Sequence, residues 1–166
     1  MRRSSSSFAV GALALGLSLA SAACTRSDGW TEPGARPQIV SVTGPSLEGG
    51  TVRNTVECKP EATGGACPIA VAISFRLPED QFVWKAYVRF QNDGSEDGVE
   101  REYLVEPRYG EGDTPVTALV NAQVPPELIR VGALNRYSVR LLTGIGETSE
   151  PSTLPLSIQA PRAKER

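Results

Sequence analysis

The chain contains no histidine among its 166 residues. This absence excludes the Ser-His-Asp and Cys-His nucleophile systems and removes a ligand of the common zinc sites. No Ser-x-x-Lys motif follows the first 23 residues. Carboxylates are plentiful, but none stands in a position typical of the acid pair of a glycoside hydrolase. The sequence therefore predicts a protein that is not an enzyme.

Long apolar runs and positive charge are also scarce. The apolar run Phe8–Leu19 has 12 residues, whereas a membrane-spanning helix needs about 20. The chain has 17 basic and 19 acidic residues, and two of the basic ones, Arg2 and Arg3, precede this run. A basic patch is the electrostatic signature of nucleic-acid binding, so we expect no nucleic-acid partner.

The first residues have the layout of a secretory signal. Arg2 and Arg3 give a positive start, Phe8–Leu19 is apolar, and small residues follow. This is the order of the charged, apolar and cleavage regions of a signal peptide. We expect residues 1–23 to be that signal peptide.

The stretch Ser21-Ala22-Ala23-Cys24 resembles the lipobox of bacterial lipoproteins, although that family prefers leucine at the position of Ser21. The resemblance implies lipidation of Cys24, with palmitate, a tether over residues 24–36 and a membrane-anchored protein of the bacterial cell envelope. Cleavage after Ala22 by an ordinary signal peptidase is the alternative. It would give a periplasmic or secreted protein with a free thiol at Cys24.

Cysteine counting agrees with lipidation. The chain has three cysteines, Cys24, Cys58 and Cys67, and an odd count in an exported protein leaves one thiol to explain. If Cys24 carries lipid, Cys58 and Cys67 can form a disulfide in an oxidising compartment. Their short loop is then either a structural staple between two strands, which we favour, or a rigid binding loop.

Apolar residues alternate with polar ones in eight segments beyond residue 36, and this period predicts strands. Sixteen glycines and 13 prolines supply turns between them. We predict an all-β, antiparallel domain over residues 37–160, with a charged tail at 161–166. The expected strands are residues 38–42, 51–58, 69–75, 83–90, 99–105, 116–124, 136–142 and 154–158.

Three of these segments carry more specific expectations. The strand over 51–58 should place Val52, Asn54, Val56 and Cys58 on one face, and the strand over 83–90 should turn Trp84 toward the core. Charged residues over 99–105 predict an edge strand, because charge discourages pairing with other chains. One helical turn is expected within 125–131.

The segment GALNRYSVRLLTG, residues 132–144, resembles the region of immunoglobulin-like and fibronectin type III domains in which a leucine precedes a tyrosine corner. PIAVAISFRLP, residues 68–78, is similar to the second strand of bacterial Ig-like modules. The resemblance implies an Ig-like or fibronectin III-like sandwich of about 7–8 strands. Alternation over 136–142 predicts that Tyr137 is buried with Val139 and Leu141. The resemblance implies that its hydroxyl bonds to backbone between Val131 and Leu134.

A candidate metal site lies in QNDGSEDGVE, residues 91–100. Asp93, Ser95 and Asp97 alternate there and Gly98 follows, which resembles the start of a calcium loop. The closing glutamate of an EF-hand would fall at Leu104, which has no oxygen to offer. A solvated hairpin loop is the competing interpretation.

These features predict a non-enzymatic cell-envelope lipoprotein whose β-sandwich binds or scaffolds another envelope macromolecule. The alternatives are a calcium- or carbohydrate-binding module and a hydrolase that uses acidic loops. A carbohydrate module usually exposes aromatic side chains on one face, and the candidates here are few: Tyr87, Tyr103 and Tyr109. This scarcity favours a protein partner, and no cofactor is expected.

Overall fold

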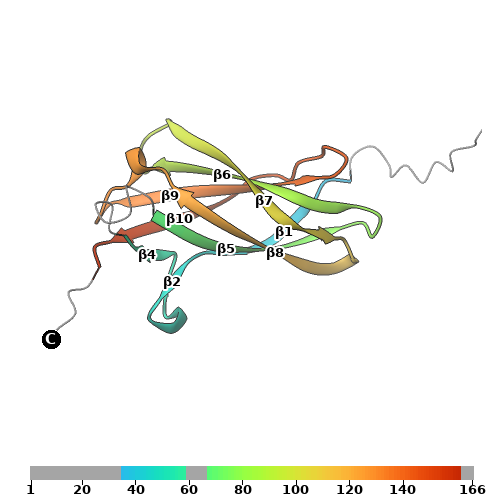
Figure 1. Ribbon diagram of the computed structural model, residues 1–166, viewed down its shortest axis with the longest axis horizontal. Helices are drawn as coiled ribbons and strands as arrows, with labels where there is room; N and C mark the ends of the chain where they lie inside the picture. The colour runs from blue at the N-terminus through green and yellow to red at the C-terminus, as the bar shows by residue number, and fades with distance from the viewer. Residues whose placement is uncertain (1–34, 59–66, 162–166) are drawn as a thin grey trace, which may run out of the picture. The chain divides into compact units, whose positions relative to one another are not determined.

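The computed structural model describes residues 35–58 and 67–161, and most of them lie in β-strands (Figure 1). The predicted all-β class is confirmed. The expected signal peptide, Cys24 and most of the expected tether and tail lie outside the described residues. The strands are β1 (Gln38–Thr43), β2 (Ser46–Leu47), β3 (Val52–Arg53), β4 (Thr55–Glu57), β5 (Cys67–Leu77), β6 (Phe82–Asn92), β7 (Gly98–Tyr109), β8 (Gly112–Val124), β9 (Leu134–Thr143) and β10 (Ser152–Gln159).

Two short 3-10 helices, η1 (Glu48–Gly50) and η2 (Pro126–Leu128), interrupt the strands. The second confirms the single helical turn expected after residue 124. Within the described residues there is no helix of the length and apolar character needed to cross a membrane.

The strands form two larger sheets and one small hairpin. One sheet has the order β1-β5-β8 and the other β4-β10-β9-β6-β7, while β2 pairs with β3. All pairs are antiparallel except β4 with β10, which is parallel. The charged strand β7 is an edge, as predicted. β1 begins and β10 ends at opposite ends of the domain (Figure 1).

Both larger sheets contribute to a single hydrophobic core. Along β5 the side chains of Ile69, Val71, Ile73 and Phe75 are buried, while the residues between them are more exposed. Alternate residues of β6, β8 and β9 are buried in the same cluster. Full burial of such a side chain contributes about 1.5–3 kcal/mol, so these inner faces hold the two sheets together.

The single strand predicted over 51–58 is wrong. Asn54 adopts a left-handed backbone conformation, with φ 53°, and divides the segment into β3 and β4. Asparagine tolerates that conformation better than most residues because its short side chain can bond locally. The division reverses the expected facing, because Thr55 is buried and Val56 is only partly buried.

The inward position predicted for Trp84 is also wrong. The register of β6 with both β7 and β9 shifts between Val83 and Lys85. Such a bulge places two residues opposite one and changes the alternation of faces. Val83 therefore faces the core, whereas Trp84 is partly buried and its indole Nε1 donates a hydrogen bond to the Thr143 carbonyl at 3.2 Å.

Candidate functional site

The predicted disulfide between Cys58 and Cys67 is confirmed. The two Cα atoms are 5.5 Å apart and both side chains are buried in the core. Cys58 follows β4 and Cys67 begins β5, so the bond joins a strand of the five-stranded sheet to a strand of the three-stranded sheet. This position supports the structural-staple interpretation. The loop between the two cysteines lies outside the described residues.

The three candidate calcium ligands lie in the exposed hairpin between β6 and β7. The Asp93 carboxylate forms an ion pair with Arg136 of β9, and the Ser95 hydroxyl accepts a hydrogen bond from the Asp97 amide at 3.2 Å. Among the described residues, no three acidic or cysteine side chains gather closely enough to hold a metal ion. Calcium binding stays a prediction, and the hairpin interpretation accounts for each of these contacts.

The three tyrosines considered for carbohydrate binding lie in different surroundings. Tyr87 is beneath Arg140, whose guanidinium carbon is 5.4 Å from the ring centroid. The Tyr103 hydroxyl bonds to the backbone of Gln123 on β8, and the Tyr109 ring packs against Phe82 at 5.3 Å. The structure does not bring these rings together into one stacking platform.

The outer faces of the two larger sheets differ in charge. On the five-stranded sheet, Lys85 pairs with Glu102 at 2.6 Å and Arg140 with Glu100 at 2.8 Å. The outward residues of the three-stranded sheet are small or uncharged along most of its length: Ser41, Thr43, Ala70, Ala72, Ser74, Thr117, Leu119, Asn121 and Gln123. The second face thus offers hydrogen bonding and apolar contact, with charged side chains such as Arg76 confined to one end.

An open groove of about 840 Å³ lies at the end of the domain where β1 begins. Residues 35–39, 76–78, 112–113 and 150–152 line it, so four distant segments meet there. Its wall combines apolar side chains such as Ile39 and Leu77 with the charged groups Arg76 and Asp113. The sequence contains no motif that predicts this groove, because each segment contributes only two to five residues to it.

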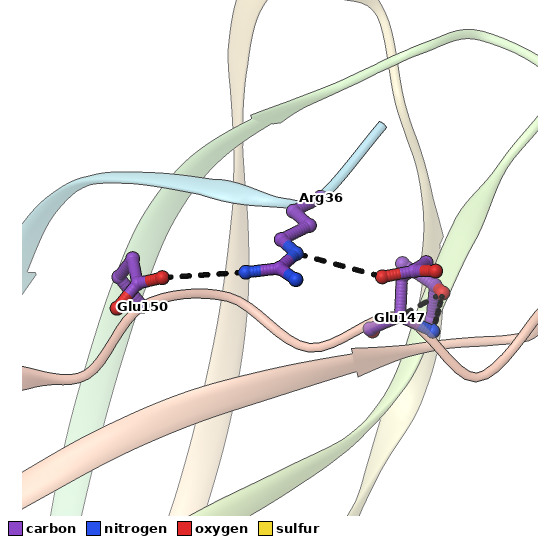
Figure 2. A network of polar contacts seen from close by, with 4 residues as sticks. Arg36, Glu147 and Glu150 are labelled. Atoms are coloured by element: carbon purple, nitrogen blue, oxygen red, sulfur yellow. Dashed lines mark hydrogen bonds and ion pairs between the residues drawn. The ribbon is translucent and has the colours of Figure 1, made fainter. Parts of the chain in front are cut away.

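Arg36 lines this groove and forms two ion pairs with the β9–β10 connection. Figure 2 shows its guanidinium between Glu147 and Glu150, both in the β9–β10 connection. Arg36 Nε is 3.6 Å from Glu147 and Nη1 is 3.4 Å from Glu150. Each exposed pair contributes less than about 1 kcal/mol. Their effect is to hold the last residue of the expected tether against the domain.

Tyr137 is buried in the core, as predicted, with its ring centroid 6.3 Å from that of Phe90. The predicted bond from its hydroxyl to upstream backbone is wrong, because the hydroxyl makes no hydrogen bond to any described residue. It lies instead beside Gly44, where an added Cβ would be 2.5 Å from the hydroxyl oxygen. The upstream carbonyl of Leu134 accepts a bond from the Asp93 amide. Burial raises the pKa of the Tyr137 hydroxyl to about 12.

Comparison with known proteins gives no family for this chain. No protein-family model matches it, and no curated protein matches it. One similar solved structure is astrotactin-2, described as a conserved vertebrate-specific and perforin-like membrane protein involved in neuronal development. The TM-score is 0.39 at 12% identity, over 68% of this chain and 21% of that one. A likeness of this size carries no argument about function.

Proposed function

We propose that this chain is an exported cell-envelope lipoprotein without enzymatic activity, whose β domain binds or scaffolds another envelope protein. The observation that carries the proposal is the Cys58–Cys67 disulfide. Disulfides persist in oxidising compartments outside the cytosol. With two of the three cysteines joined, Cys24 is the remaining one, and it follows the apolar segment at the position of a lipobox cysteine.

We further propose that the domain is an Ig-like or fibronectin III-like sandwich. Its strand order supports this assignment, because β1, β5 and β8 correspond to strands A, B and E, while β6, β9 and β10 correspond to C, F and G. β7 lies beside β6, as strand C′ lies beside C in variable-type domains. Tyr137 near the start of β9 has the position of a corner tyrosine, although its hydroxyl has a different neighbour.

The position of Arg36 supports an orientation for binding. Its ion pairs hold the end of the expected tether at one end of the domain. The β6–β7 hairpin and the η2 connection lie at the other end, near the last residues of β10. These loops therefore lie at the end of the domain opposite Arg36. We propose that they contact the partner.

Substitution of Cys24 tests the anchoring. In the producing cell, Cys24→Ala should abolish labelling by a palmitate analogue and move the protein from the detergent phase to the aqueous phase, because the acylated residue is lost. Ser21→Leu is the matched control, since it restores the preferred lipobox residue and should keep both properties. An unmodified mature N-terminus at Ala23, identified by mass spectrometry, would exclude lipidation.

A further inference from the structure

The free edge of β8 differs from the other sheet edges of the domain. β8 pairs with β5 along one side, and no other described strand forms a ladder with its second side, although β7 packs near it and the Tyr103 hydroxyl bonds to the Gln123 backbone. An unpaired strand edge presents a row of N–H and C=O groups to which another strand can add. Most proteins protect such edges with charge, proline, bulges or short strands.

The other edges of the two larger sheets carry these protections. β7 has Pro107 and several charged residues, and β4 is only three residues long. β1 is preceded by Pro37, and its register shifts between Ile39 and Ser41. By contrast, residues 116–124 of β8 contain neither a charged residue nor a proline. Among the edges of the two larger sheets, β8 is therefore the one whose central residues carry none of these protections.

Pro68 and Tyr103 identify the residues of β8 whose backbone N–H and C=O groups point to this edge. Pro68 lies opposite Gln123 and has no N–H, so this pair cannot be hydrogen-bonded across the β5–β8 ladder. Both backbone groups of Gln123 instead bond to the Tyr103 hydroxyl, at 3.1 and 3.2 Å. They therefore point away from β5.

In an antiparallel strand, every second residue directs its backbone N–H and C=O groups to the same side. Asn121, Leu119 and Thr117 have the same phase as Gln123, so their N–H and C=O groups also point to the open edge. Their side chains lie on the outer face of the sheet, and Leu119 is 65% exposed.

We propose that this edge of β8 pairs antiparallel with the same edge of a second copy of the chain. The two-fold axis passes between the two copies of Leu119, which lie directly opposite each other, and Thr117 of each copy faces Asn121 of the other. All three pairs are of the hydrogen-bonded kind and give about six backbone bonds. The three-stranded sheets of the two copies then form one continuous six-stranded sheet.

Some β8 residues can form backbone bonds at the free edge and others cannot. The order of these residues along the strand favours a second copy of the chain as the partner. In this register Pro115 of one copy lies opposite Gln123 of the other. Pro115 has no N–H, and the Gln123 groups are already bonded to Tyr103, so two positions that cannot pair coincide. The strand has no charge to repel itself, and the two exposed Leu119 side chains form an apolar cross-strand pair. An interface that matches itself in this way is isologous.

Opposite charges placed at Leu119 test the two-fold geometry. The measurement is analytical ultracentrifugation of the full chain in a Cys24→Ala background, which removes any lipid. The parent should dimerise as its concentration rises. Leu119→Lys and Leu119→Asp should each weaken dimerisation by about tenfold or more, because like charges then lie directly opposite. An equimolar mixture of the two variants should recover the dimer.

Ile145→Lys is the matched control. Ile145 is also exposed, at 53%, but lies in the β9–β10 connection and is not part of β8. This variant should dimerise as the parent does. A parent that stays monomeric, or a mixture no stronger than its separate components, would overturn the proposal.

Amide hydrogen exchange of the parent gives a readout that needs no variant. The amides of Thr117, Leu119 and Asn121 should exchange more slowly as the concentration rises, whereas the Gln123 amide should not respond. Exchange independent of concentration at all three positions would equally refute β8 pairing.

Discussion

Tyr137→Ala should lower the free energy of unfolding by about 3–5 kcal/mol, as measured by urea denaturation. Tyr137 has the largest fully buried side chain among the described residues, and its ring packs near Phe90. Removing the ring forfeits its transfer free energy and leaves a cavity that a close-packed core only partly closes. An unchanged denaturation midpoint would mean that the ring is not part of the core.

Tyr137→Phe is the control, because it keeps the ring and removes only the hydroxyl. This hydroxyl is buried without a hydrogen bond to a described residue, and such a group costs free energy. The phenylalanine variant should therefore be at least as stable as the parent at neutral pH. If Tyr137→Phe lowered the free energy of unfolding as much as Tyr137→Ala does, the hydroxyl itself would be needed for the stability of the core.

The free energies of unfolding of the parent and of Tyr137→Phe should depend differently on pH in alkaline solution. The Tyr137 pKa is raised from 10.0 to about 12 by burial, so the unfolded chain releases this proton first. Fewer protons on the unfolded state mean that stability falls as the pH rises from about 10 to about 12. The contribution of this group is about 1.4 kcal/mol per pH unit. Tyr137→Phe should lack that contribution, so equal slopes in the two proteins would contradict it.

Loss of the disulfide should have the second largest effect. Cys58→Ala/Cys67→Ala should lower the free energy of unfolding by about 2–3 kcal/mol, because the bond closes a short loop and restricts the unfolded chain. Replacing both residues avoids leaving a single buried thiol. Urea denaturation of the oxidised parent and of the double variant measures the difference.

Cys24→Ala is the matched control for the disulfide, since it removes the remaining cysteine. It should leave the unfolding free energy of the β domain unchanged. A reducing agent should lower the stability of the parent and of this control equally, and should not affect the double variant. Equal stability of the oxidised parent and the double variant would show that the bond constrains nothing.

The sequence predicts a strand correctly where its alternating apolar residues all face one core without a break in the strand. β5 was predicted because Ile69, Val71, Ile73 and Phe75 face one core without interruption. Asn54 was misassigned because its left-handed conformation interrupts a segment whose side chains still alternate in sequence. Trp84 was misassigned because the bulge involves the register of β6 with both β7 and β9, which lie far along the chain.

The candidate sites divide in the same way. Cysteine counting predicted the Cys58–Cys67 bond, because few pairings were available. The groove beside Arg36 needed four segments to meet, and the open edge of β8 depends on which strands become neighbours. The environment of the Tyr137 hydroxyl was missed for a similar reason, since Gly44 approaches it from another part of the chain.

The parallel pairing of β4 with β10 determines how this part of the five-stranded sheet would respond to a mechanical load. Backbone bonds from the Ser157 amide to the Asn54 carbonyl and from the Cys58 amide to the Gln159 carbonyl extend this pair at both ends. Because the strands run in the same direction, tension between the N-terminal side of β4 and the C-terminal side of β10 shears these bonds together. Antiparallel neighbours pulled from one end would instead unzip bond by bond. The Cys58–Cys67 bond links the end of β4 covalently to the start of β5, so β5 would carry part of this load.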